Sequence, residues 1–219
     1  MTRQKTIWMV GSSVVLLGVL AVVMALGPGG PPSGPGREVF VAGAETNPPL
    51  PVYYDAPAFA LTDQLGRAVT DDDLRGKVWV ADFFFTSCPG ICPVLSRNMQ
   101  RLNRAIADHP RRDELRLVSF SLDPETDTPE VLAEYAEALG AAPDRWLFLT
   151  GEKQVLWNLS EDGFKLIVDD NFQDPLNPIA HSGKVVLIDR LGVVRGYYDG
   201  LTAEGIQAAQ RDLLRLLEE

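Results

Sequence analysis

Two cysteines are the residues whose type and spacing point most directly to chemistry. Cys88 and Cys92 are separated by three residues, and they follow the apolar run of residues 77–85 (KVWVADFFF). Pro93 comes directly after Cys92 and suits the first turn of a helix. Backbone N–H groups and the dipole at a helix start favour thiolate over thiol, and thiolates are both nucleophiles and metal ligands. The pair therefore predicts a redox site or a site for a soft metal.

The spacing of the cysteines bears on the choice between these two kinds of site. A disulfide that closes and reopens in each catalytic cycle suits a shorter loop, with two intervening residues. Three intervening residues widen the loop, and on helical geometry they would place both sulfurs on one face. Two converging thiolates suit Cu(I) or Zn(II). A metal site, a redox pair and two small buried hydrophobic residues all stay open as interpretations of the pair alone.

The elements that must position the cysteines alternate between strands and helices. Residues 77–85 are typical of a strand buried on both faces, and residues 94–107 show apolar side chains at helical spacing. The pattern predicts further strands at residues 57–62, 115–122, 146–149, 184–189 and 193–198, and further helices at residues 129–139 and 201–217. This α/β order is the layout of a thioredoxin-like fold with an N-terminal extension and a central insertion.

A metal site needs a ligand beyond two sulfurs, and the chain has two histidines. His181 lies just ahead of residues 184–189 (KVVLID), in a loop that thioredoxin-like topology brings beside the cysteine loop. His109 lies at the far end of the cysteine helix, about 25 Å from Cys92 on a straight helix, and is expected to be a solvated helix terminus. His181 is the candidate ligand, with a hydrogen-bonded histidine at a strand edge as the alternative. Two sulfurs and one nitrogen favour Cu(I), because zinc normally takes four ligands.

The first 26 residues predict a transmembrane anchor. Residues 7–26 (IWMVGSSVVLLGVLAVVMAL) carry no charge, and as a helix they would span about 30 Å, the thickness of the hydrocarbon layer. Arg3 and Lys5 precede them, so the positive-inside rule keeps the N-terminus in the cytoplasm and places the rest outside the cell membrane, in the periplasm or its equivalent. A cleaved signal peptide is the alternative. Residues 27–51 are then a Pro/Gly-rich linker, and residues 52–219 the folded domain.

Composition limits the classes of partner and fold. Asp and Glu number 30 against 20 Lys and Arg, which gives a formal net charge of −10. Nucleic acid is not an expected partner, because that binding depends mainly on Lys and Arg contacts to phosphates. Two cysteines cannot supply a disulfide framework, so the fold must depend on its apolar core.

Four segments together resemble the Sco/SenC family: residues 83–99 (FFFTSCPGICPVLSRNM), 121–136 (SLDPETDTPEVLAEYA), 145–151 (RWLFLTG) and 181–200 (HSGKVVLIDRLGVVRGYYDG). The resemblance covers roughly residues 52–218, with the motifs in the family's order. It implies a membrane-anchored, thioredoxin-like copper protein that helps to assemble cytochrome c oxidase. It also implies that Cys88, Cys92 and His181 are the copper ligands.

Two further segments bear on this resemblance. The family's acidic DPxxDTP motif corresponds here to Asp123, Pro124, Asp127, Thr128 and Pro129. Asp123 is a candidate for copper transfer or partner docking, with capping or turn formation as the alternative. Residues 171–180 (NFQDPLNPIA) lack the Val-Asp-His-Ser motif common in the family, so the loop that holds His181 is expected to differ in geometry.

The leading prediction is a copper metallochaperone that binds Cu(I) and delivers it to the copper site of a cytochrome c oxidase subunit. The alternative is an extracytoplasmic thiol-disulfide oxidoreductase that keeps the oxidase's copper-ligand cysteines reduced, with Cys88 attacking and Cys92 resolving. A peroxidase related to peroxiredoxins is a third interpretation. Phe85 argues against it, because a peroxidatic Thr-x-x-Cys arrangement would need threonine three residues before Cys88.

Overall fold

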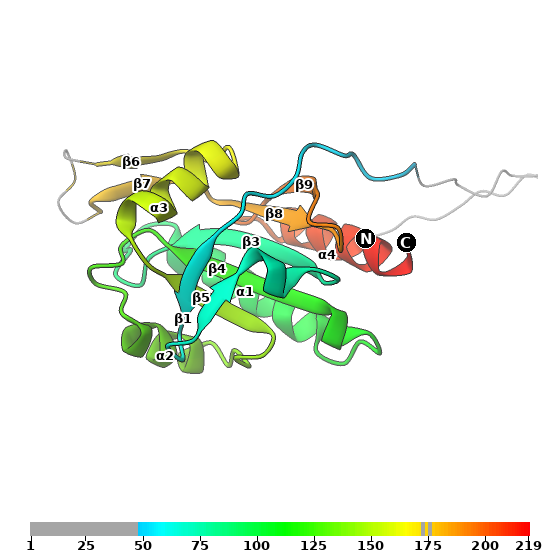
Figure 1. Cartoon of the computed structure of the whole chain (residues 1–219), viewed down its shortest axis with the longest axis horizontal. Coiled ribbons are helices and arrows are strands. Elements are labelled where there is room, and N and C mark those ends of the chain that lie inside the picture. The colour runs from blue at the N-terminus through cyan, green and yellow to red at the C-terminus, as the bar shows by residue number, and fades with distance from the viewer. Residues whose placement is uncertain (1–47, 172–173, 175–176) are drawn as a thin grey trace, which may run out of the picture. The chain divides into compact units, whose positions relative to one another are not determined.

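The computed structural model describes residues 48–171, 174 and 177–219 (Figure 1). The predicted anchor over residues 1–26 lies outside this part of the chain, as do residues 27–47 of the predicted linker. Among the helices that are described, none combines the length and the apolar character needed to cross a membrane. The division of the chain at residues 26 and 51 stays a prediction.

A mixed sheet of seven strands, counted over the described residues, organises the fold in the order β2-β1-β5-β4-β3-β8-β9. Strands β3, β4 and β5 are parallel to one another, and antiparallel pairs extend the sheet on both sides. The strands are β1 (Ala60–Asp63), β2 (Ala68–Thr70), β3 (Val78–Phe84), β4 (Leu115–Ser121), β5 (Trp146–Thr150), β8 (Lys184–Ile188) and β9 (Val194–Asp199).

Strand β3, which leads into the cysteine loop, is buried along its whole length. Successive side chains of a strand point to opposite faces of the sheet. Phe84 accordingly stacks on Tyr135 on one face, with ring centroids 5.4 Å apart. Phe83 stacks on Phe120 of β4 on the other face, at 5.1 Å. Both faces of the sheet are therefore covered by apolar core, as the continuous apolar run predicted.

Helices cover the sheet and set the direction of the chain after the cysteines. Helix α1 (Cys92–Ile106) packs against α4 (Ala203–Glu218), and α2 (Pro129–Ala138) packs on β5 (Figure 1). The apolar stripe that predicted α1 faces the core, since Leu95, Met99 and Leu102 are fully buried. Thr128 and Thr202 are the N-caps of α2 and α4, and each side chain accepts a backbone N–H from the first turn.

The central insertion lies between β5 and β8. It consists of α3 (Lys153–Asn158), the π-helical turn η3 (Leu159–Gly163), and the hairpin of β6 (Val168–Asp170) with β7 (Ile179–His181). Within the described residues, β6 and β7 pair with each other and not with the main sheet. Figure 1 shows this hairpin beside α3. The insertion itself was predicted, whereas its individual helices and strands were not.

The predicted strand over residues 57–62 is displaced in the structure, where β1 covers Ala60–Asp63. Pro57 has no N–H to give to a ladder, and the N–H of Phe59 donates to the Asp71 carboxylate at 3.1 Å instead of to a strand. Strand β2 and the 3-10 turns η1 (Asp71–Leu74) and η2 (Arg112–Glu114) are too short to leave a periodic pattern and were missed. The other predicted strands and helices agree with the structure to within two residues at each end.

Candidate metal centre

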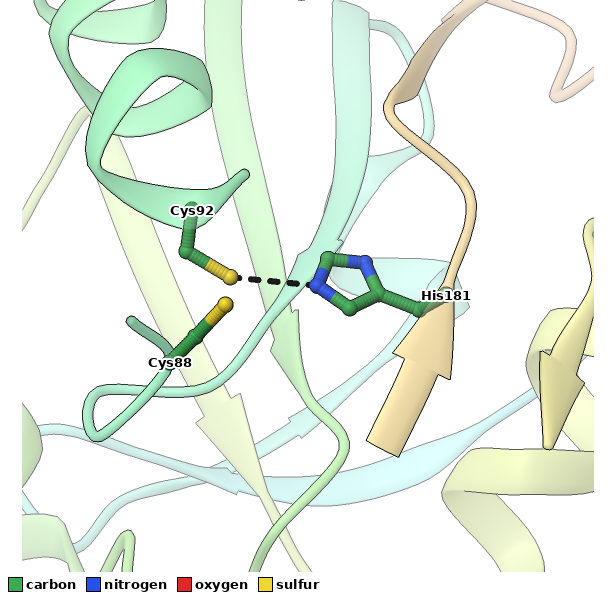
Figure 2. Close-up of side chains that lie close together, drawn as sticks. All are labelled: Cys88, Cys92 and His181. Carbon is green, nitrogen blue, oxygen red and sulfur yellow. Dashed lines mark hydrogen bonds between the residues drawn. The ribbon is translucent and has the colours of Figure 1, made fainter. Parts of the chain in front are cut away.

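Cys88, Cys92 and His181 come together from three parts of the fold (Figure 2). Cys88 lies in the loop after β3, Cys92 is the first residue of α1, and His181 is the last residue of β7. One ligand atom from each residue lies within 4.8 Å of the other two, and Cys92 Sγ is 3.1 Å from His181 Nε2. Within the described part of the chain, no other group of three or more His, Cys, Asp and Glu side chains converges in this way.

The loop over residues 85–91 places the two sulfurs. The N–H of Cys88 donates to the carbonyl of Phe85 at 3.3 Å, which turns the chain back at the end of β3. The N–H of Leu95 donates to the carbonyl of Ile91 at 3.0 Å, so the helix begins at Cys92. Cys88 therefore precedes the helix, and the helical-face argument does not describe this pair. The turn of the loop, and not helical periodicity, brings the sulfurs together.

The orientation of the His181 ring is set on both sides. Its Nδ1 is 3.1 Å from the carbonyl oxygen of Ser182, which can only accept, so the proton is assigned to Nδ1 and the lone pair to Nε2. The Phe85 ring packs edge-on against the imidazole, with centroids 5.7 Å apart. His181 pairs with Val168 of β6, so it lies at the end of a hairpin strand and not in the loop that was predicted. The Nε2 lone pair thus points at the sulfurs.

The two cysteines have opposite acid–base character. The pKa of Cys88 is lowered to about 4, mainly because the neighbouring Cys92 thiol donates a hydrogen bond to the Cys88 sulfur. His181 and the backbone N–H groups of Cys92 and Gly90 lower this pKa further, whereas burial opposes the shift. The Cys88 sulfur in turn raises the pKa of Cys92, with burial adding to the effect. Both are free cysteines. The reduced pair therefore shares one proton, with the thiolate favoured at Cys88 and the thiol at Cys92.

Alkylation should report this arrangement. Because a thiolate reacts and a thiol does not, the rate of Cys88 alkylation in the reduced, metal-free protein is expected to rise with a midpoint near pH 4. An ordinary cysteine has a midpoint at about pH 8.5. Iodoacetamide kinetics with mass-spectrometric assignment of the modified cysteine measure it. Cys92→Ala removes the neighbouring thiol and should move the midpoint upward by at least about one unit. A native midpoint near 8 would contradict the assignment.

Comparisons with known proteins identify the family. The SCO1/SenC family model matches residues 53–218. This chain belongs to the SCO1/SenC family. The SCO1 protein homolog of Bacillus subtilis is 32% identical over 152 residues, which cover 69% of this chain and 77% of that protein.

Solved SCO1/SenC structures share the fold. BsSco, a member of the Sco family of cytochrome c oxidase assembly proteins in which a disulfide switch was identified, is 30% identical with a TM-score of 0.66, over 76% of this chain and 95% of BsSco. Bradyrhizobium japonicum ScoI, solved with copper bound, is 26% identical with a TM-score of 0.62, over 74% of this chain and 99% of ScoI. The thioredoxin-like fold predicted from the sequence is confirmed.

Two side chains near the SCO1/SenC cysteine pair were missed by the sequence analysis. Asp82 of β3 is buried, which raises its pKa to about 7, while a hydrogen bond from the Ser119 hydroxyl at 2.5 Å opposes this. An acid inside the apolar run of residues 77–85 was the available signal. Asn177 carries its Oδ1 3.9 Å from Cys88 Sγ, and it covers Gly90 from the hairpin side. No spacing pattern distinguishes Asn177 in the sequence.

The remaining candidates of this SCO1/SenC chain lie apart from the cluster. His109 follows α1, where its Nδ1 accepts the N–H of Arg111 at 3.2 Å, as expected of a histidine at the far end of the helix. The backbone carbonyl of Asp123 accepts N–H groups from Thr126 and Asp127, so the turn that was weighed for this residue is present. The roles of Cys88, Cys92 and His181 as ligands stay a prediction.

Proposed function

We propose that this SCO1/SenC protein binds Cu(I) through Cys88, Cys92 and His181 and delivers it to the copper site of a cytochrome c oxidase subunit. The observation that carries the proposal is the convergence of two sulfurs and an imidazole nitrogen within 4.8 Å of one another. Soft thiolates select Cu(I), whereas a zinc site normally takes a fourth ligand. The copper-bound structure of Bradyrhizobium japonicum ScoI supports the choice of metal. The membership of BsSco among oxidase assembly proteins supports the choice of acceptor.

The geometry suits a metal that is cargo and not a resident cofactor. Two sulfurs and one nitrogen leave Cu(I) a low coordination number, so an acceptor thiolate can bind before a donor thiolate leaves. Cys88 is 6% exposed and Cys92 is 1% exposed, so an approaching acceptor meets Cys88 first. The low pKa of Cys88, about 4, keeps this sulfur ready as a ligand at neutral pH.

We place this function outside the cytoplasm, with residues 7–26 as an uncleaved anchor. The uncharged stretch and the basic Arg3 and Lys5 ahead of it support this location. A tethered domain would meet membrane-bound oxidase subunits at high effective concentration.

Anaerobic titration of the reduced protein with Cu(I) tests the proposal. We expect one copper per chain, with two sulfur neighbours and one nitrogen neighbour in X-ray absorption. The control is Cys88→Ser, which should lose one sulfur neighbour while the fold remains. Binding of less than one equivalent, or a site with no nitrogen neighbour, would reject the three-ligand assignment.

A thiol-disulfide oxidoreductase is the second candidate, and the thiolate at Cys88 beside the thiol of Cys92 favours it. Cys88 would attack a partner disulfide, one partner sulfur would leave as a thiolate, and Cys92 would then displace the second partner sulfur and close a Cys88–Cys92 disulfide. The disulfide switch identified in BsSco supports the formation of such a bond. Rapid reduction of insulin disulfides by the protein, without copper in the freshly isolated sample, would favour this function over delivery.

A further inference from the structure

Asp127 is a fully buried carboxylate that joins the end of β4 to the start of the cysteine loop after β3. The Ser121 hydroxyl, at the end of β4, donates to its Oδ2 at 2.6 Å. The backbone N–H of Thr86 lies 3.3 Å from Oδ1 and 3.2 Å from Oδ2, and the Thr86 hydroxyl also donates to Oδ1. Both carboxylate oxygens are thus held by groups of the protein, and Asp127 is 0% exposed. Asp127 is therefore closed to a metal ion.

The contact between Asp127 and Thr86 bears on the cysteine loop because Thr86 lies two residues before Cys88. Thr86 follows the buried Phe85, whose carbonyl accepts the N–H of Cys88 at 3.3 Å. The direction in which Cys88 leaves the end of β3 thus depends on the residue that Asp127 holds. Because the loop between Phe85 and Ile91 contains Pro89 and Gly90 but no regular hydrogen-bonded ladder, this anchor is a large part of what orients its first half.

The same stretch of chain also holds the other end of the cysteine loop. Thr128, directly after Asp127, caps α2. Tyr135 of α2 hydrogen-bonds to Ser96 in the first turns of α1 at 2.7 Å, and its ring stacks on Phe84 at the end of β3. Residues 121–135 therefore contact the chain just before Cys88 and just after Cys92.

We propose that Asp127 is a positioning residue that sets the direction of the Cys88 sulfur toward Cys92 and His181, an inference that builds on the proposed copper function. Its carboxylate acts through Thr86 and touches no ligand atom. The contact explains why an acid of the DPxxDTP motif is buried against Ser121 at the end of β4 and against Thr86, two residues before Cys88, although 41 positions separate Asp127 from Thr86.

Asp127→Asn tests the proposal, because asparagine keeps the size of the side chain but replaces one acceptor oxygen with an NH2 group. In the reduced, metal-free protein, we expect excess oxidised glutathione at pH 7 to close the Cys88–Cys92 disulfide about tenfold more slowly, since Cys88 loses the orientation that faces its sulfur toward Cys92. In this reaction one cysteine sulfur displaces a glutathione thiolate, and the other cysteine sulfur then displaces the second. We also expect Cu(I) affinity to fall by about tenfold in competition with a chromophoric chelator. Thr86→Val removes only the hydroxyl donor and should change both quantities in the same direction by a smaller factor. The disulfide measurement needs no copper, so it separates failure of this inference from failure of copper binding.

Two matched variants control for charge and for stability. Glu125→Gln removes an exposed negative charge from the same segment, and Ala208→Gly weakens α4, a helix outside residues 121–135. Both should keep the native rate of disulfide closure and the native copper affinity. If Asp127→Asn lowers the unfolding temperature but leaves the rate of disulfide closure unchanged, as Ala208→Gly should, then Asp127 stabilises the fold only and the inference is overturned.

Discussion

Substitution of His181 by alanine is expected to lower the Cu(I) affinity of the reduced protein by at least about 100-fold. Loss of an outer-sphere partner of a metal ligand typically costs about 10- to 100-fold in affinity, so loss of a direct ligand should cost at least as much. His181 supplies the only nitrogen donor of the cluster, and its Nε2 lies 3.1 Å from Cys92 Sγ. Competition with a chromophoric Cu(I) chelator under anaerobic conditions measures the change.

The fold should survive this substitution. The His181 side chain is only partly buried and packs against one ring, that of Phe85, so the unfolding temperature of the metal-free protein is expected to change little. His109→Ala is the matched control, because it removes the other histidine at the far end of α1 and should leave copper affinity at the native value. His181→Met, which offers a soft thioether, should recover part of the lost affinity. Native affinity and a retained nitrogen neighbour in the His181→Ala variant would refute the role of His181 as a ligand.

Replacement of Asp82 by asparagine is expected to stabilise the metal-free protein at alkaline pH. Burial raises the pKa of Asp82 to about 7, whereas an unfolded aspartate titrates near 4, so the folded state binds its proton more tightly than the unfolded state. Below about pH 4 the carboxyl is neutral in both states and the folded state is not penalised. As the pH rises from about 4 through about 7, the unfolded carboxyl ionises before the folded one, and the free energy of unfolding of the native protein falls. The asparagine variant stays neutral in both states and keeps its free energy of unfolding.

The size of the effect follows from the difference between the two pKa values. Between pH 5 and pH 8, the free energy of unfolding of Asp82→Asn, relative to the native protein, should rise by about 3 kcal/mol at most. Comparison at two pH values cancels the constant cost of burying the amide group. Urea unfolding of the reduced protein at both pH values measures this change in the free energy of unfolding. The control is Asp108→Asn, which removes one negative charge at an exposed position. Equal relative stability of Asp82→Asn at both pH values would contradict a raised pKa.

Sequence patterns predicted the parts of this protein that depend on local periodicity. The apolar run of β3, the apolar stripe of α1 and the capped starts of α2 and α4 each follow from side-chain spacing within one element. The resemblance to the Sco/SenC family was carried by short contiguous motifs, and the family model over residues 53–218 confirms it. The candidate ligands Cys88, Cys92 and His181 could be named from the same motifs.

The tertiary structure alone decided how those residues meet. Cys88 reaches Cys92 through a turn before the helix, and His181 reaches both from a hairpin that pairs apart from the main sheet. Asp127 holds the cysteine loop across 41 positions of sequence. Such contacts depend on chain folding between distant segments, and neither a period of 2 nor a period of 3.6 residues encodes them. The burial that raises the pKa of Asp82 is likewise a property of the layers packed over β3, because desolvation depends on what surrounds a carboxyl in space and not on its neighbours in sequence.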